Sequence, residues 1–358
     1  MIYVPEHITS IKPYIPGKPV EELERDLGIS GSVKLASNEN PLGPSPLAIK
    51  AIRSGLKELN RYPDGSCYYL RKVLSDKLNV SDDQLIFGNG SNEIIELAVR
   101  TCISPGSEAI MAHPSFVVYS MIVQAAQGNN IVVPLKDWRH DLEAMASQIS
   151  DRTRLIFIAN PNNPTGTINT KAEMDRLMKK VPEDVLVIVD EAYYEYVESK
   201  EYPDSFKYLK ANSNILLLRT FSKIYGLAGL RIGYGIATAS LIEAMNKVRQ
   251  PFNVNSLAQI AAMEALRDDN HVRRVKQLNI RGKKFLYKEL EKMGISFVPS
   301  EANFIYVTFN EEVAGSIYEK MLKQGVIVRP MGPNAIRITT GLQGENRKLV
   351  RALEKSLK

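Results

Sequence analysis

The sequence predicts an α/β protein with a large, mostly parallel sheet and a smaller α+β domain after it. The chain has 358 residues, which is long for a single hydrophobic core. Between residues 65 and 255, apolar runs alternate with amphipathic segments, as in parallel sheets that are covered by helices on both faces. Beyond residue 255 the helical segments become longer and more charged, which indicates a second unit.

Seven short apolar runs are the strand candidates of the large sheet. They lie at 85–87, 109–111, 131–133, 155–158, 185–189, 215–218 and 232–237. Their continuous hydrophobicity is typical of strands that are buried on both faces, so we expect a seven-stranded sheet. Amphipathic helices are expected at 68–78 and at 91–101, the second opened by a Gly-Asn-Gly-Ser-Asn turn.

The C-terminal part predicts a shorter alternation of helices and strands. Charged helices at 256–293 come first, and they are followed by a strand at 303–307, a helix at 314–324, strands at 326–329 and 335–339, and a final helix. The N-terminal residues are rich in proline, which favours an irregular arm. We therefore expect an arm at 1–31, a large domain at 32–254 and a small domain at 255–358.

Composition and charge exclude several classes of protein. The net charge is +6, but lysine and arginine are interleaved with acidic residues, which disfavours a nucleic-acid partner. Cys67 and Cys102 are the two cysteines, and their spacing suits neither a metal site nor a redox motif. No signal peptide or membrane-spanning run is evident. We expect a cytoplasmic protein that binds no metal, membrane or nucleic acid.

An amine is predicted at the edge of the large sheet. Ser222 and Lys223 follow the apolar run 215–218, and open α/β sheets bind ligands at the carboxyl ends of their strands. Lysine can form a Schiff base with an aldehyde, and Ser222 and Arg231 suit a phosphate. Thr220 lies nearby in the sequence. The alternative is an ordinary surface lysine in a glycine-rich loop.

A carboxylate is predicted beside this amine. Asp190 follows the apolar run 185–189, and a buried carboxylate is costly unless it meets a cation or a donor. A pyridinium nitrogen would be such a partner. A helix N-cap is the alternative, since aspartate also favours that position. Tyr193 lies three residues further on, where its hydroxyl could reach the same ligand.

Two loops complete the predicted site. Asn163 belongs to a turn, 160–166, in which two prolines fix the backbone at the end of a strand. Taken alone, this composition is also that of an ordinary turn. The segment 88–93 opens a helix whose free N–H groups favour an anion. It is not a dinucleotide fingerprint, because Glu93 replaces the third glycine.

In this order, the motifs resemble those of the fold-type I pyridoxal-phosphate aminotransferases over nearly the whole chain. The resemblance implies that Lys223 carries pyridoxal 5′-phosphate as a Schiff base, and that Asp190 keeps its ring nitrogen protonated, which makes the ring an electron sink. The other implied cofactor contacts are Tyr193 and Asn163 at the ring oxygen, Phe116 on the ring face, and Ser91, Asn92, Ser222 and Arg231 at the phosphate.

Within that family, segments 12–19, 35–41, 60–63 and 219–223 are most similar to histidinol-phosphate aminotransferases. The resemblance implies a homodimer in which Tyr62 reaches the partner's cofactor phosphate. It also implies transamination between L-histidinol phosphate and 2-oxoglutarate, a step of histidine biosynthesis. Arg329 and Arg337 are candidate partners for substrate carboxylate or phosphate. Tyr14 and Asn303 are substrate contacts by resemblance.

Other readings of the same motifs stay open at this point. A decarboxylase of threonine phosphate handles a phosphorylated amine on the same fold, and an aromatic amino-acid aminotransferase shares the cofactor chemistry. A regulator that keeps the fold would carry an added DNA-binding domain, for which we expect no room in this chain. The absent third glycine disfavours a dinucleotide-binding protein.

Overall fold

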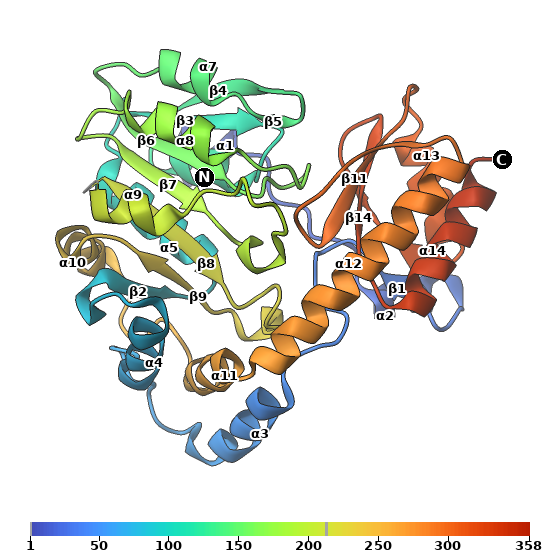
Figure 1. Cartoon of the computed structure of the whole chain (residues 1–358), viewed down its shortest axis with the longest axis horizontal. Helices are drawn as coiled ribbons and strands as arrows, with labels where there is room; N and C mark the ends of the chain where they lie inside the picture. Colours follow the sequence, from blue (N-terminus) through green and yellow to red (C-terminus); the bar gives the residue numbers. More distant parts are fainter. Residues whose placement is uncertain (1, 212–213) are drawn as a thin grey trace.

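A computed structural model describes residues 2–211 and 214–358 of the chain. Figure 1 shows a large body built around one sheet and a smaller body that contains the C-terminal helices. The large sheet has the strand order β2-β9-β8-β7-β6-β3-β4-β5. Strands β3, β4, β6, β7 and β8 are parallel, whereas β9 runs antiparallel to both β8 and β2. The predicted α/β class is confirmed.

All seven predicted runs form strands of this sheet. Their bounds are β2 (Leu85–Gly88), β3 (Glu108–His113), β4 (Asn129–Lys136), β6 (Thr153–Ala159), β7 (Leu186–Asp190), β8 (Ile215–Thr220) and β9 (Gly233–Ile236). The predicted number of seven strands is wrong by one, because β5 (Arg139–His140) adds an eighth. It pairs with β4 through a tight hairpin in which Asp137 and Trp138 both have positive φ. Such turns usually contain glycine or asparagine, so an Asp-Trp pair does not predict this hairpin.

Helices cover both faces of the large sheet. Their bounds are α3 (Pro46–Gly55), α4 (Tyr68–Leu78), α5 (Ser91–Cys102), α6 (Val118–Ala125), α7 (Leu142–Ser147), α8 (Lys171–Met178), α9 (Ser205–Ala211), α10 (Ala239–Val248) and α11 (Ser256–Arg267). Alternate residues of β7 enter different cores: Val187 and Val189 join one hydrophobic cluster, and Ile188 joins the other. Because both faces are buried, the strands read as continuous apolar runs.

The smaller body has its own sheet and core. Its elements are α12 (Asp269–Lys292), β10 (Ser296–Val298), β11 (Phe304–Thr308), α13 (Ala314–Leu322), β12 (Val326–Ile327), β13 (Arg329–Pro330), β14 (Ala335–Thr339) and α14 (Gln343–Ser356). The antiparallel strand order is β10-β11-β14-β13. The strand predicted at 326–329 is two strands, because β12 pairs with β1 (Val33–Lys34) and β13 pairs with β14.

The helical region predicted at 256–293 breaks at Asp268. The side chain of Asp268 accepts a hydrogen bond from the N–H of His271 at 3.0 Å, which caps α12, and another from Ser45 at 2.5 Å. Helix α11 consequently packs against α3 and α4, while α12 runs toward the smaller body (Figure 1). The proposed division of the chain at residues 31 and 254 stays a prediction.

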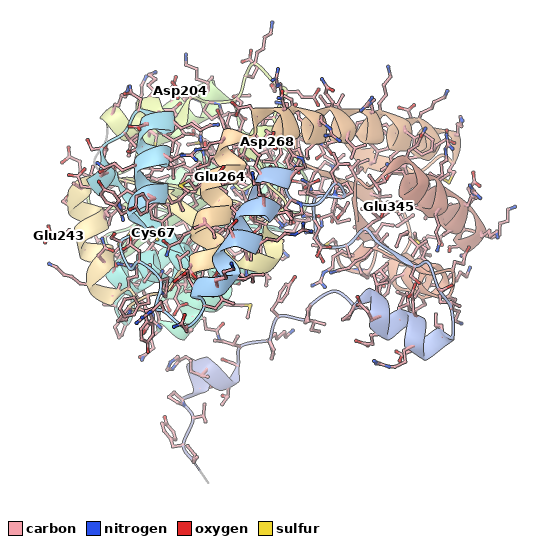
Figure 2. All side chains as sticks on the ribbon, turned by 90° about the horizontal axis from the view of Figure 1, so that it is seen from below. Cys67, Asp204, Glu243, Glu264, Asp268 and Glu345 are labelled. Carbon is pink, nitrogen blue, oxygen red and sulfur yellow. The ribbon has the colours of Figure 1, made fainter. Side chains whose placement is uncertain are left out.

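The N-terminal segment extends along the outside of the molecule. At the lower edge of Figure 2, it runs from the short helix α1 (Glu6–Thr9) to α2 (Val20–Leu27). Helix α1 is held at α6, where Gln124 Nε2 donates to the His7 carbonyl oxygen at 3.1 Å. Helix α2 is anchored to the smaller body, where Leu23 packs with Ala36 and Ile327. Within residues 2–211 and 214–358, no helix is long and apolar enough to cross a membrane.

Candidate active site

A cavity of about 330 Å³ lies where the carboxyl ends of the large sheet's strands meet the smaller body. The residues predicted for the site that line this cavity are Tyr14, Ser91, Asn92, Phe116, Asn163, Asp190, Tyr193, Ser222, Lys223, Arg231 and Arg337. Tyr14 comes from the N-terminal segment and Arg337 from β14, and the others lie at the end of β7 or after β2, β3, β6, β7 and β8. Parallel strands thus bring together side chains that are far apart in sequence.

The Lys223 amine is held inside this cavity. Its Nζ donates to the carbonyl oxygen of Ser37 at 3.3 Å and lies 5.6 Å from the centre of the Tyr193 ring. The turn that carries it closes with the N–H of Gly226 donating to the Lys223 carbonyl at 3.0 Å. Burial, followed by the charge of Arg337, lowers the pKa of Lys223 from 10.5 to about 8. A lysine with such a pKa is a usable base and nucleophile near neutral pH.

The Asp190 carboxylate lines the same cavity, and Asp190 is buried. Its Oδ2 accepts from the Tyr119 hydroxyl at 2.7 Å, and its Oδ1 accepts from the N–H of Ala192 at 3.0 Å. Burial raises the pKa of Asp190, while these hydrogen bonds and the positive charge of Lys223 oppose the shift. Tyr119 also lines the cavity, and the sequence analysis missed it.

A cradle for an anion forms at the start of α5. Ser91 and Asn92 occupy the first turn of this helix, and Arg231 donates from Nη1 to the Ser222 hydroxyl at 3.3 Å. Gly90 has φ +82°, and a Cβ at this position would lie only 2.4 Å from Arg231 Nη2. Glycine therefore lets the guanidinium approach the helix N-terminus. The cradle combines one positive charge, two hydroxyls and backbone N–H groups, which suits a phosphate.

Polar side chains from both bodies meet around Tyr193. Asn38 donates from Nδ2 to the Tyr193 hydroxyl at 2.9 Å, and burial raises the pKa of Tyr193 to about 12. Arg337 donates from Nη1 to Asn163 Oδ1 and from Nη2 to the carbonyl oxygen of Ala36 at 2.6 Å. Its buried Nε finds no hydrogen-bond partner among the described residues. Arg337 thus brings a positive charge from the smaller body to the cavity.

Three predicted residues do not line the cavity of this single chain. Tyr62 is 84% exposed, and its ring stacks on Phe252 with the centroids 4.9 Å apart. Asn303 is buried behind the cavity, where its Nδ2 donates to the Asn38 carbonyl oxygen at 3.0 Å. Arg329 lies over the Tyr14 ring, with its guanidinium carbon 5.4 Å from the ring centre. The functional roles assigned to these residues stay predictions.

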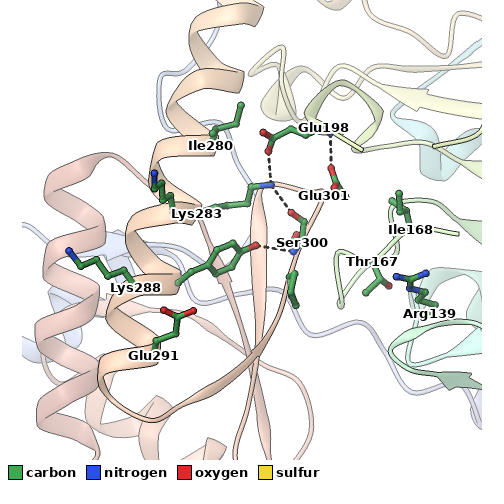
Figure 3. A pocket seen from close by; sticks show the side chains of 13 residues that line it. Arg139, Thr167, Ile168, Glu198, Ile280, Lys283, Lys288, Glu291, Ser300 and Glu301 are labelled. Atoms are coloured by element: carbon green, nitrogen blue, oxygen red, sulfur yellow. Dashed lines mark hydrogen bonds and ion pairs between the residues drawn. The ribbon is translucent and has the colours of Figure 1, made fainter. Parts of the chain in front are cut away.

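A larger cavity of about 610 Å³ lies elsewhere, between α12 and the loop at 299–301 on one side and the large body on the other (Figure 3). Its buried lysine is already engaged, since Lys283 Nζ donates to the Ser300 carbonyl oxygen at 2.6 Å and pairs with Glu198 at 3.3 Å. Lysines and glutamates are mixed along its wall. We therefore place the chemistry in the smaller cavity.

The lowered pKa of Lys223 predicts a pH profile for its amine. Reductive alkylation of the cofactor-free protein with a small aldehyde, followed by peptide mapping, measures the neutral amine. We expect the rate at Lys223 to rise through pH 8 and to level off above it, because the neutral form then dominates. Arg337→Gln removes a neighbouring positive charge and should move the midpoint upward. A rate that keeps rising to pH 10.5 would contradict the assigned environment.

Comparisons with known proteins agree with this arrangement. The family model described as aminotransferase class I and II matches residues 30–353. The chain is 48% identical to histidinol-phosphate aminotransferase of Moorella thermoacetica over 98% of this chain and 92% of that protein. The enzyme of the same name from Caldicellulosiruptor saccharolyticus is 48% identical, with 98% and 99% covered.

A solved structure gives the same result at the level of the fold. It is histidinol-phosphate aminotransferase from Sinorhizobium meliloti in complex with pyridoxal-5′-phosphate, and it superimposes with a TM-score of 0.91 at 27% identity. The match covers 98% of this chain and 96% of that one. The resemblance that the motifs indicated is thereby confirmed, and the chain belongs to the class I and II aminotransferase family.

Proposed function

We propose that this chain is a pyridoxal-phosphate-dependent aminotransferase that converts L-histidinol phosphate and 2-oxoglutarate to imidazole-acetol phosphate and L-glutamate, and back. The observation that carries the proposal is the convergence of the Lys223 amine, the Asp190 carboxylate and the Ser222–Arg231 cradle on one cavity. The relatives that are 48% identical over 98% of the chain carry the same enzyme name. Such an enzyme serves histidine biosynthesis.

The residues of the cavity fit this cofactor. The cradle that Gly90 leaves open for Arg231, together with Ser91, Asn92 and Ser222, would hold the phosphate. The buried Asp190 would pair with a protonated ring nitrogen, which offsets the cost of burying its charge. The remaining contacts would come from Phe116 on the ring face and from Tyr193 and Asn163 at the ring oxygen. When bound, the pyridinium ring delocalises the electron pair that is left on the substrate carbon.

Lys223 has two tasks in this proposal. Its Nζ would hold the cofactor in the resting enzyme, and once substrate is bound it would move a proton from the substrate Cα. A pKa of about 8 leaves a substantial fraction of the amine neutral at mildly alkaline pH, which is what a general base requires. Burial supplies this property, since desolvation is the largest cause of the shift.

The substrate end of the cavity is positively charged. Arg337 lines this region, its Nε has no hydrogen-bond partner among the described residues, and Arg329 lies across the Tyr14 ring. The two substrates alternate in one site: histidinol phosphate carries a phosphate and no α-carboxylate, whereas 2-oxoglutarate carries two carboxylates. Guanidinium groups pair with either anion, so one pair of arginines can serve both. Asn303 would support the wall from behind through Asn38.

The competing functions are less well supported. Neither an aromatic amino-acid aminotransferase nor a threonine-phosphate decarboxylase is favoured by the relatives reported above. We also propose residence in the cytoplasm, and the division into an arm at 1–31 and domains at 32–254 and 255–358. These expectations come from the sequence and the family resemblance.

A half-reaction without 2-oxoglutarate tests the substrate. The cofactor-loaded enzyme is mixed with histidinol phosphate, L-phenylalanine or O-phospho-L-threonine, and the cofactor absorbance is followed. We expect histidinol phosphate to react at least roughly tenfold faster than phenylalanine, a difference of about 1.4 kcal/mol in transition-state binding. Lys223→Ala should abolish the reaction, whereas Lys284→Ala, which removes an exposed lysine of α12, should not. Faster phenylalanine turnover, or release of carbon dioxide from phosphothreonine, would overturn the proposal.

The homodimer is the second part of the proposal. Exposed apolar side chains gather near the start of α4, among them Leu59, Tyr62, Tyr69 and Phe252. A patch of this kind on one chain is typical of a surface that a partner covers. In the dimer, the hydroxyl of Tyr62 would reach the partner's cofactor phosphate.

Tyr62→Phe tests that contact. We expect light scattering to give twice the chain mass of 40.1 kDa for both wild type and variant, because the ring and its stacking are kept. Cofactor affinity should fall by roughly tenfold, the effect of losing a hydrogen bond to a charged group. Tyr68→Phe on α4 is the matched control and should bind normally. A monomeric wild type, or unchanged affinity in Tyr62→Phe, would refute the dimeric site.

A further inference from the structure

We propose that Tyr119 is a positioning residue for Asp190, and that its hydroxyl keeps the proton on the ring nitrogen of the bound cofactor. The inference rests on the proposed function for the identity of that cofactor. It deepens that proposal, because it adds a residue that neither the motifs nor the family resemblance pointed to.

The geometry fixes the carboxylate at both oxygens. The Tyr119 hydroxyl donates to Oδ2 at 2.7 Å, and the backbone N–H of Ala192 donates to Oδ1 at 3.0 Å. Rotation of the Asp190 carboxyl group would break both hydrogen bonds. One donor lies two residues after the end of β7, whereas the other comes from α6, which packs against α5, β3 and β4. Tyr119 therefore controls the orientation of Asp190 from a separate element.

Tyr119 is itself held rigidly. Its side chain is 1% exposed, and its ring stacks on Phe157 of β6 with centroids 4.6 Å apart and planes 12° apart. The Phe116 ring meets it edge-on, with centroids 5.5 Å apart. The same tyrosine thus contacts the residue proposed to lie on the cofactor ring and the residue proposed to face its nitrogen. Because this packing already orders the Tyr119 side chain, the hydrogen bond to Asp190 costs little additional side-chain entropy.

The hydroxyl also has an electrostatic effect. Burial raises the pKa of Asp190, and the donated hydrogen bond lowers it again by stabilising the ionised form. The other titratable groups that act on Asp190 are Lys223, which lowers its pKa, and Glu191, which raises it. Tyr193 lies close as well, and burial keeps it neutral. Without the Tyr119 hydroxyl, the carboxylate becomes a stronger base and competes better for the proton of the ring nitrogen.

Tyr119→Phe removes this hydroxyl and keeps both ring contacts. The enzyme is loaded with pyridoxal phosphate that carries ¹⁵N in the ring, and the nitrogen resonance is recorded by NMR. We expect the ¹⁵N chemical shift of the wild type to be that of a protonated ring nitrogen. In the variant, the chemical shift should move toward that of a neutral ring nitrogen. The kcat should fall roughly tenfold while KM changes less than about twofold, because the loss affects the chemical step rather than substrate binding.

Tyr208→Phe is the matched control. The Tyr208 hydroxyl donates to Asp175 at 2.7 Å, the same bond length as in the Tyr119–Asp190 pair, but neither Tyr208 nor Asp175 lines the cavity. This control should leave the nitrogen resonance and kcat unchanged, and melting curves of both variants report on the fold. In an Asp190→Ala background, the additional Tyr119→Phe change should have no further effect on the resonance.

The outcomes separate the two proposals. If the ring nitrogen is protonated in the wild type and stays equally protonated in Tyr119→Phe, this inference is overturned. The proposed function is then unaffected. A Tyr119→Phe effect that persists undiminished in the Asp190→Ala background would also overturn it, since the tyrosine would then act through another group. A wild-type protein that takes up no pyridoxal phosphate would overturn both.

Discussion

The buried ion pair between Glu191 and Arg219 joins the strand ends that carry the site. Their side chains are 0% and 5% exposed, and Arg219 donates from Nε and Nη2 to Glu191 Oε2 at 2.8 Å. The Tyr202 hydroxyl also donates to Glu191 at 3.3 Å and to the carbonyl oxygen of Asn160 at 2.5 Å. Since Asn160 directly follows β6, Tyr202 connects the end of β6 to the ion pair. Removing one partner of such a pair leaves an unpaired buried charge, at a cost of about 3–5 kcal/mol. The positions of Asp190 on β7 and Lys223 after β8 depend on this arrangement.

The cavity also depends on contact between the two bodies. Arg337 reaches from β14 to Asn163 and to the carbonyl oxygen of Ala36. Asn38 accepts from Thr339 at 3.0 Å and donates to Tyr193, so one loop connects the smaller sheet to the end of β7. The groups proposed to hold the cofactor belong to the large body, while the Arg337 charge proposed for the substrate comes from the smaller one. An anionic substrate can therefore stabilise the contact between the two bodies on binding.

Sequence reasoning predicted the fold and most of the cavity because the relevant signals are local. Continuous apolar runs identify buried parallel strands, and the polar residues that follow them must meet at one edge. Tyr119 gave no such signal, because it reads as a core aromatic of a helix and its partner Asp190 is 71 residues away. Asn38 was likewise missed as a cavity residue, since its role depends on a backbone φ of +56° and on partners in three segments. Tyr62 is exposed on the single chain, which agrees with the proposal that a partner chain completes the site.

Borohydride reduction of the cofactor-loaded enzyme, followed by peptide mapping, identifies the lysine that carries the cofactor. If Lys223 Nζ carries the cofactor, the reduced label lies on the peptide that contains Lys223. Lys283 is an internal reference, because it is also buried but its Nζ is engaged by Ser300 and Glu198. We expect stoichiometric labelling of Lys223 and none of Lys283. A label on Lys283 or on any other lysine, with Lys223 unmodified, would contradict it.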